Sequence, residues 1–277
     1  MKKYIVEHEF DGYEIGTYLK ETKGYSSRGL RNLEIYLNGK RIKNNAKKIK
    51  KLNRIVIIEK EKSTGIKAMD IPIVNKEPYI IVHPTQKKVD KTLANAVVNY
   101  FEKTLGKTLV PRFYNRLDMN TSGLIIIAKN AYTQAFLQDK TEVKKTYKVI
   151  ASGIIEDDNF FIELPIGKVG DDLRRIELSE ENGGKSAKTH IKVLERNRDK
   201  NITFLEARLY TGRTHQIRAH LSLIGHPLVG DELYGGDMNL AKRQMLHAYK
   251  LEFQNPKTLE NLKVEIEIPL DMKEVLK

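Results

Sequence analysis

The sequence of 277 residues contains no cysteine. This absence excludes disulfide bonds, thiol catalysis, cysteine-ligated zinc and iron–sulfur clusters. A chain without disulfides needs no oxidising compartment, so we expect it in the cytoplasm.

Long apolar runs are also missing. No segment approaches the roughly 20 apolar residues that cross a bilayer. The first ten residues, MKKYIVEHEF, have no apolar run of the kind found in secretory signals. The sequence therefore predicts a protein without a membrane partner.

Acidic residues are outnumbered by basic ones. Lys and Arg total 49 against 36 Asp and Glu, which gives a net charge of +13. Such a surplus favours an anionic partner, and without a membrane-spanning run a nucleic acid is the better candidate. With 40% hydrophobic and 31% charged residues, the composition is typical of a globular protein with a sizeable core.

Residues 1–60 are predicted to form a small α/β module. Residues 14–22 suit a first helix, and a second helix is expected after it. Asn38-Gly39 is typical of a tight turn between two hairpin strands, and residues 55–58 suit another strand. The charged stretch 61–69 is interpreted as a linker to a large domain at 70–277.

Between the hairpin and the last strand of this module, half of the residues are basic and none is acidic. This stretch is either a solvated surface or an edge that contacts the phosphates of a nucleic acid. Its basic residues are Arg41, Lys43, Lys47, Lys48, Lys50, Lys51 and Arg54.

The large domain opens with predicted strands at 71–76 and 80–84, followed by an amphipathic helix that begins near Thr92. Further along, Asp118 precedes a turn that ends at Gly123, and residues 124–128 are apolar and predict a buried strand. A carboxylate on such a turn is held rigidly, as a catalytic group must be. The alternative is that Asp118 only caps the turn and pairs with Arg116.

Residues 208–236 contain a predicted helix, with Thr214 as its cap and Gly225 at its end. Arg218 lies one position off the apolar face of this helix, so it borders the core. A buried arginine is rarely left unpaired, and Asp118 is the natural candidate for its partner.

The seven histidines do not indicate a metal site. His215 and His220 are five residues apart, whereas zinc pairs on helices are spaced by four. The glycines of 230–236 lack the strand and helix that flank a phosphate-binding loop. We expect neither a metal nor a cofactor.

Two motifs resemble those of a known family. Arg116-Leu117-Asp118 is followed by Thr121-Ser122-Gly123 and an apolar strand, and residues 211–221 read TGRTHQIRAHL. The second motif continues with Gly-His-Pro, Gly-Asp and Tyr-Gly. These strings resemble the signatures of the RluA-type pseudouridine synthases, which isomerise selected uridines in RNA.

The resemblance implies roles for five residues. Asp118, Tyr147 and Arg218 would be catalytic, with Tyr147 on a predicted strand at 144–150, and Arg116 and Arg213 would contact RNA. Asn115 stands where many relatives have His.

The implied reaction breaks the bond between ribose and the ring nitrogen, rotates the base, and rejoins it through a ring carbon. The target uridine must first be flipped into the site. Asp118 would either attack the anomeric carbon or remove a ribose proton to give a glycal. The sequence does not choose between these routes.

The implied fold is α+β, with a curved and mostly antiparallel mixed sheet flanked by helices. Residues 1–60 resemble the RNA-binding module named after ribosomal protein S-four. A basic module of this kind suits large structured RNA, so we favour ribosomal RNA of the large subunit over tRNA, bound by a monomer.

Two other classes compete with this interpretation. A non-catalytic RNA-binding or ribosome assembly factor could keep the fold, although it would not need Asp118, Tyr147 and Arg218 together. A glycoside hydrolase also acts at an anomeric carbon, but such enzymes usually pair two carboxylates, and the Asp118 motif offers no second one.

Overall fold

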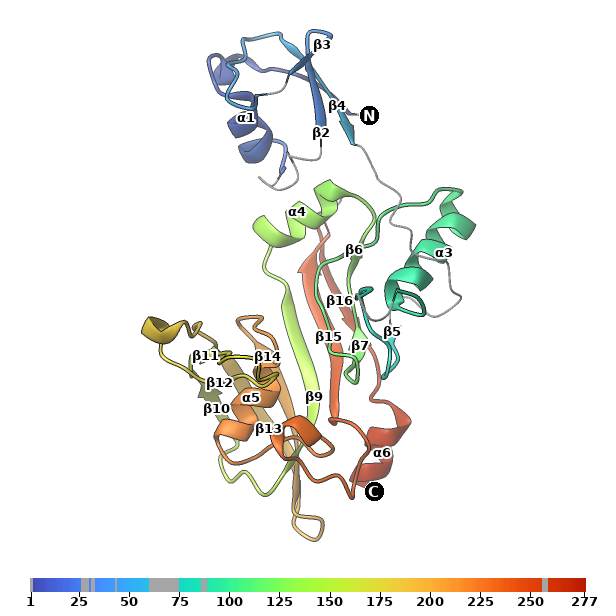
Figure 1. Ribbon diagram of the computed structural model, residues 1–277, viewed down its shortest axis with the longest axis vertical. Coiled ribbons are helices and arrows are strands. Elements are labelled where there is room, and N and C mark those ends of the chain that lie inside the picture. The colour runs from blue at the N-terminus through green and yellow to red at the C-terminus, as the bar shows by residue number, and fades with distance from the viewer. Residues whose placement is uncertain are drawn as a thin grey trace. The chain divides into compact units, whose positions relative to one another are not determined.

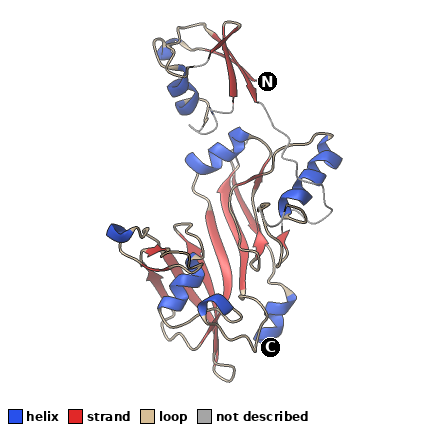
Figure 2. Cartoon of the chain, viewed as in Figure 1, coloured by secondary structure: helices blue, strands red, loops and turns tan. Residues whose placement is uncertain are grey.

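The computed structural model shows two compact units, which are described separately (Figures 1 and 2). The first comprises residues 1–70, 94–114 and 127–142, and the second comprises residues 71–93, 115–126 and 143–277. The residues that the structure describes are 2–25, 30, 33–42, 44–59, 75–85, 89–255 and 259–277.

The division of the chain at residues 60 and 70 stays a prediction. The linker at 61–69, most of the strand expected at 71–76, the start of the second N-terminal helix and Lys43 lie outside the described residues.

The first unit contains a four-stranded antiparallel sheet in the order β1-β4-β2-β3. The helix α1 (Ile15–Glu21) buries Ile15, Tyr18 and Leu19 in the core of this module. The sheet and helix share one apolar core and form a local α/β fold, whereas a separate RNA-binding module at residues 1–60 stays a prediction. The strands are β1 (Lys2–Ile5), β2 (Leu33–Leu37), β3 (Lys40–Ile42) and β4 (Arg54–Glu59).

The predicted hairpin turn is confirmed between β2 and β3. Asn38 has φ 48° and Gly39 has φ 81°. Two successive residues with positive φ match the twist of the flanking strands, and Asn-Gly is the dipeptide that adopts this conformation most readily.

The same unit also contains two further helices and a short strand pair. Asn130 caps α4, since its side chain accepts a hydrogen bond from the Thr133 amide at 2.8 Å. The elements are α3 (Leu93–Leu105), β6 (Arg112–Phe113), β8 (Ile127–Ala128) and α4 (Ala131–Asp139).

The second unit is built on an eight-stranded sheet in the order β10-β13-β14-β9-β15-β7-β5, with β16 paired to β15. Every pair is antiparallel except β15 with β7, which confirms the predicted mixed and mostly antiparallel sheet. The strands are β5 (Asn75–Lys76), β7 (Ser122–Leu124), β9 (Lys144–Ser152), β10 (Asn159–Ile162), β13 (Thr189–Asn197), β14 (Ile202–Leu209), β15 (Leu246–Gln254) and β16 (Asn261–Glu265).

Two helices pack against this sheet. Met272 and Val275 of α6 (Leu270–Leu276) form one core cluster with Ile150 of β9 and Ile202 of β14. The helix α5 (Gln216–Leu223) packs through Ala219 near the small ribbon of β11 (Ile166–Gly167) and β12 (Ile176–Glu177). The remaining elements of the described residues are the 3-10 turns η1 (His8–Phe10) in the first unit and η2 (Glu180–Asn182) and η3 (Glu232–Tyr234) in the second.

The prediction of one strand over residues 124–128 is wrong. β7 ends at Leu124 and β8 begins at Ile127, and the two belong to different sheets. The buried carboxamide of Asn115 explains the break, because its nitrogen donates to the Leu124 carbonyl at 3.1 Å and its oxygen accepts from the Ile126 amide at 2.9 Å. One side chain thus makes the hydrogen bonds that a neighbouring strand would make.

The strand expected at 80–84 is also wrong. The Ile80 carbonyl accepts from the Lys76 ammonium at 3.0 Å, and the Ile81 carbonyl accepts from the Leu93 amide at 2.9 Å. These partners hold the segment in an irregular bend. Among the described helices, none is long and apolar enough to cross a membrane.

Candidate active site

Asp118 lies on the turn that enters β7, as the sequence predicts. The Thr121 amide donates to the Asp118 carbonyl at 3.1 Å, and the Asp118 side chain is 29% exposed. Gly123 follows with φ 115°, where a Cβ would come within 2.3 Å of the Ala248 carbonyl oxygen of β15. Only glycine therefore allows the close approach of β7 to β15 that fixes this turn.

The backbone after Asp118 is held by a buried lysine. The Lys76 ammonium donates to the carbonyls of Met119, Ile80 and Glu77 at 2.9–3.0 Å, and the residue is 1% exposed. Burial lowers the pKa of Lys76 to about 7. Three carbonyl acceptors favour the charged ammonium over the neutral amine, which can donate only two hydrogen bonds.

A buried arginine holds the next residue of the turn. Arg243 donates to the Asn120 carbonyl at 3.2 Å, and its other nitrogens form two hydrogen bonds with Asp271 of α6 at 2.7 and 2.9 Å. The Gln244 amide donates to the Thr121 hydroxyl at 3.3 Å. Every residue from Met119 to Thr121 is thus bonded to a buried side chain, which restricts the motion of Asp118.

Ser122, near the end of the turn, is held by a hydrogen bond of 2.8 Å between its hydroxyl and Nδ1 of His247. Burial, with the positive charge of Arg243 as a second cause, lowers the pKa of His247 to about 4. In the unfolded chain this imidazole has an ordinary pKa near 6.5. Between these two values the unfolded state binds more protons than the folded state.

We therefore expect acid to destabilise the protein through His247. Its contribution to the free energy of unfolding should be complete above about pH 6.5 and fall by about 3 kcal/mol as the pH falls to about 4. His247→Gln, which keeps a polar side chain beside Ser122, should lose less stability over this interval. Urea unfolding of both proteins at several pH values tests this, and equal pH dependences would contradict it.

The predicted pairing of Arg218 with Asp118 is confirmed. Nη1 of Arg218 donates to Oδ2 of Asp118 at 2.9 Å. The other edge of the guanidinium donates to both carboxylate oxygens of Asp231, with Nε–Oδ2 at 2.6 Å and Nη2–Oδ1 at 2.8 Å. Asp231 is 1% exposed and Arg218 is 6% exposed. Asp231 therefore fixes the guanidinium, and the guanidinium fixes the carboxylate of Asp118.

Thr214 does not cap the helix that carries Arg218. α5 begins at Gln216, and its N-cap is His215, which has φ 56° and makes no capping hydrogen bond with its side chain. The left-handed backbone instead places Nε2 of His215 at 3.8 Å from Oδ2 of Asp118 and Nδ1 at 3.3 Å from the Tyr234 hydroxyl. Burial lowers the pKa of His215, while the negative charge of Asp118 acts in the opposite direction.

Tyr147 lies on β9, where the predicted strand is confirmed. It is opposite Ala248 of β15, and Ala248 is opposite Gly123 of β7, so one row of the sheet runs from Tyr147 toward the Asp118 turn. The residue is 6% exposed. Burial and then the charge of Asp118 raise the pKa of the Tyr147 hydroxyl, which keeps it protonated.

The described residues that are predicted to contact RNA are exposed, but no described contact joins them to Asp118. Nε of Arg213 donates to the Ser186 carbonyl at 3.0 Å. Arg116, next to the Asp118 turn, contributes after burial to the lowered pKa of His83. The described basic residues of the stretch 41–54 are all exposed: Arg41, Lys47, Lys48, Lys50, Lys51 and Arg54.

The residues of this site lie within a segment that matches a known protein family. Residues 70–223, which include Asp118, Tyr147 and Arg218, match the family model described as RNA pseudouridylate synthase. The chain belongs to this family. The synthase is 40% identical over 204 residues to the uncharacterized RNA pseudouridine synthase YhcT of Bacillus subtilis, a match that covers 73% of this chain and 67% of YhcT.

Two other relatives extend the comparison. An uncharacterized RNA pseudouridine synthase of Aquifex aeolicus is 30% identical to the synthase over 97% of this chain and 93% of its own length. The ribosomal large subunit pseudouridine synthase D of Haemophilus ducreyi is 35% identical over 75% of this chain and 67% of its length.

A solved structure shares the fold of the synthase. The human RNA pseudouridylate synthase domain containing 4 superposes with a TM-score of 0.59 at 20% identity, covering 76% of this chain and 91% of that one. The predicted α+β catalytic fold is therefore confirmed.

Sequence reasoning missed three residues of the synthase site: Asp231, Tyr234 and His215. Tyr234 lies in η3, its ring centroid is 5.0 Å from the Arg218 guanidinium carbon, and its hydroxyl accepts from the Arg175 amide at 2.7 Å. The Gly-Asp and Tyr-Gly pairs of residues 230–236 were the available signal. Their role could not be predicted because η3 meets α5 only through tertiary packing.

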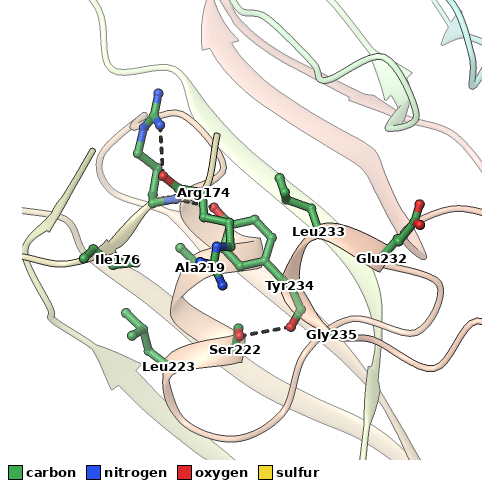
Figure 3. A pocket seen from close by; sticks show the side chains of 10 residues that line it. Arg174, Ile176, Ala219, Ser222, Leu223, Glu232, Leu233, Tyr234 and Gly235 are labelled. Carbon is green, nitrogen blue, oxygen red and sulfur yellow. Dashed lines mark hydrogen bonds between the residues drawn. The ribbon is translucent and has the colours of Figure 1, made fainter. Parts of the chain in front are cut away.

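Tyr234 also borders a pocket of about 370 Å³ between β12, α5 and η3 (Figure 3). Figure 3 shows Ser222 of α5 donating to the Tyr234 carbonyl, at 3.3 Å, beside the apolar side chains of Leu223 and Ile176. Within the described parts of the chain, no cluster of His, Cys, Asp and Glu is suited to hold a metal ion.

Proposed function

We propose that this synthase isomerises selected uridines to pseudouridine in large-subunit ribosomal RNA, with Asp118 as the catalytic carboxylate. The observation that carries the proposal is the hydrogen-bonded series from Asp231 through Arg218 to Asp118. It presents one partly exposed carboxylate at a fixed position, which the chemistry at the anomeric carbon requires.

The reaction needs neither an electron acceptor nor a cofactor. The bond from C1′ to N1 breaks, a new bond forms from C1′ to C5, the C5 hydrogen leaves as a proton and N1 gains a proton. Asp118 acts either by attack on C1′ or by removal of a ribose proton to give a glycal, and both routes begin from the charged carboxylate. The buried Tyr147 lines the place of the flipped base.

Arg116 and Arg213 are proposed to contact the RNA around the flipped uridine. Both side chains are exposed, and each lies within three residues of a site residue, Asp118 or His215. Arg116 is placed to bind phosphates or to fill the stack that the uridine vacates. Because Asp118, Arg218 and Asp231 all belong to one unit of one chain, we propose that the synthase acts as a monomer in the cytoplasm, where ribosomal RNA lies.

A glycoside hydrolase is the less favoured alternative. Asp231 is a second carboxylate close to Arg218, but it is 1% exposed and both of its oxygens accept hydrogen bonds from the guanidinium. It is therefore poorly placed to activate a water molecule. A non-catalytic RNA-binding factor remains the other alternative.

Sequencing of pseudouridines in RNA from cells with and without the protein tests the target. We expect the loss of one or a few sites in large-subunit ribosomal RNA. Loss of sites only in tRNA would contradict the proposed target. Unchanged ribosomal RNA and tRNA would favour the non-catalytic alternative.

We further propose that the basic stretch of residues 41–54 binds the phosphates of RNA through electrostatic attraction. Each phosphate contact contributes roughly −0.7 to −0.9 to the slope of log affinity against log salt. Replacing Lys47, Lys48, Lys50 and Lys51 together by Gln should therefore flatten the slope by roughly three units if all four bind phosphate.

The matched control replaces the same four lysines by Arg, which keeps the charge, and its slope should equal that of the unchanged protein. Binding to ribosomal RNA is measured at several salt concentrations. Equal slopes for the Gln variant and the unchanged protein would show that the stretch is only a solvated surface.

A further inference from the structure

A group of aromatic and basic side chains lies on the second unit outside the site described above. The rings of Phe161 and His190 have centroids 4.7 Å apart, and the rings of Phe161 and Tyr210 have centroids 5.8 Å apart. Phe161 is 49% exposed and Tyr210 is 47% exposed. These aromatic rings contribute less to the core than buried rings do, and they offer apolar surface to a ligand.

Two cations lie against these rings. The Lys188 ammonium is 4.4 Å from the Phe161 centroid and 5.9 Å from the Tyr210 centroid, and the guanidinium carbon of Arg208 is 4.8 Å from the Tyr210 centroid. Lys188 also pairs with the exposed Glu163 at 2.7 Å. Stacking surface and positive charge thus occur within one small area.

The sheet register explains why these residues meet. Phe161 of β10 lies opposite His190 of β13, and His190 lies opposite Arg208 of β14. Residues in one row project from the same face of a sheet. Arg208 in turn lies opposite Thr146, one residue before Tyr147, so this row is next to the row of Tyr147 and projects from the other face.

The group is close in sequence to the catalytic loop. Tyr210 follows β14 directly, and five residues later His215 lies 3.8 Å from Asp118. Five residues span at most roughly 18 Å, even when fully extended. An RNA strand that passes around this end of the sheet can contact both places.

We propose that Phe161, His190, Tyr210, Lys188 and Arg208 form a stacking platform for a single-stranded segment of the RNA substrate, next to the modified uridine. The proposal rests on the proposed function. Exposed aromatic rings stack with any base, and neighbouring cations bind the phosphates between the bases. A single strand is the fitting form, since bases in a duplex are already stacked on each other.

The platform is tested by measuring the affinity of the full chain for a labelled oligouridylate of about 12 nucleotides. Phe161→Leu and Tyr210→Leu should each weaken binding by roughly 5- to 30-fold, because each removes a stacked base. Their salt slopes should not change, since no charge is lost. Tyr100→Leu, which removes a tyrosine of 39% exposure on α3, is the matched control and should bind as the unchanged protein does.

Substitution of a basic residue of the platform should change the salt dependence of binding, which the aromatic variants leave unchanged. Lys188→Gln should flatten the salt slope by roughly 0.7, the value for one phosphate contact of a single strand. Lys188→Arg should restore the slope. Unchanged affinity in both aromatic variants, with unchanged melting temperatures, would overturn the platform.

A second readout separates this proposal from the proposed function. With RNA that carries tritium at C5 of uridine, Phe161→Leu should raise KM and leave kcat within about two-fold of the unchanged protein, because the ring binds RNA and does not touch the reacting atoms. If the unchanged protein releases no tritium, the proposed function is contradicted, whereas weaker oligouridylate binding by Phe161→Leu would still support the platform. An active protein whose KM and affinity are unaffected by Phe161→Leu would overturn it.

Discussion

Asp118→Asn should reduce pseudouridine formation on the order of 10⁴-fold or more, the range seen when the central group of a catalytic set is removed. The substitution keeps the size of the side chain and removes its charge. A carboxamide neither attacks an anomeric carbon nor removes a ribose proton effectively, so the loss is expected for both routes. RNA affinity should stay within a few-fold, because the phosphate-binding residues are unchanged.

The matched control is Asp157→Asn, which alters an exposed aspartate in the loop before β10. It should retain normal activity and stability. Substantial turnover by Asp118→Asn would contradict the assignment of Asp118 as the catalytic carboxylate. Equal loss in both variants would show that the assay reports something other than the chemistry at Asp118.

Arg218→Met should have the second largest effect. The change removes the cation between Asp118 and Asp231, so the position of the reactive carboxylate is no longer fixed, and kcat should fall by roughly 100-fold or more. It also leaves Asp231 buried without its partner, which should cost about 3–5 kcal/mol of stability. Arg213→Met, at an exposed residue of the preceding loop, should affect KM more than kcat.

Two variants at this position distinguish a positioning and charge effect from simple unfolding. Arg218→Lys keeps the charge but loses the paired hydrogen bonds to Asp231, so its kcat should fall less than that of Arg218→Met. Melting temperatures show whether each variant is folded at the temperature of the assay. A kcat near that of the unchanged protein in folded Arg218→Met would show that another residue holds the carboxylate.

The sequence predicted the central pair of the site for a physical reason. Arg218 lies beside the apolar face of a helix, where an unpaired guanidinium would be costly, and Asp118 was the carboxylate that the motifs made available. Local patterns were sufficient there. Asp231 was missed because its contact with Arg218 depends on the course of the loop after α5, which the Gly-Asp and Tyr-Gly pairs of that loop do not determine.

The two wrong predictions near Asp118, the strand at 124–128 and the helix cap at Thr214, share a cause. The apolar run at 124–128 satisfies every local criterion for a strand, yet Asn115 makes the hydrogen bonds that the sheet would make. Thr214 is an ordinary capping residue, but His215 in the left-handed conformation begins α5 instead. In both cases a polar residue overrides local preference, Asn115 three positions before Asp118 in the chain and His215 at 3.8 Å from its carboxylate. Such departures are common near functional sites.

The measurement that tests the account most directly follows the base itself. Total RNA labelled with tritium at C5 of uridine, from cells lacking the protein, is incubated with the unchanged protein and with Asp118→Asn. If Asp118 is the catalytic carboxylate of a pseudouridine synthase, the unchanged protein should release tritium in an amount equal to the pseudouridine formed, without free uracil. Asp118→Asn should give neither tritium release nor pseudouridine. Free uracil would indicate hydrolysis at the anomeric carbon, and equal release by both proteins would contradict the role of Asp118.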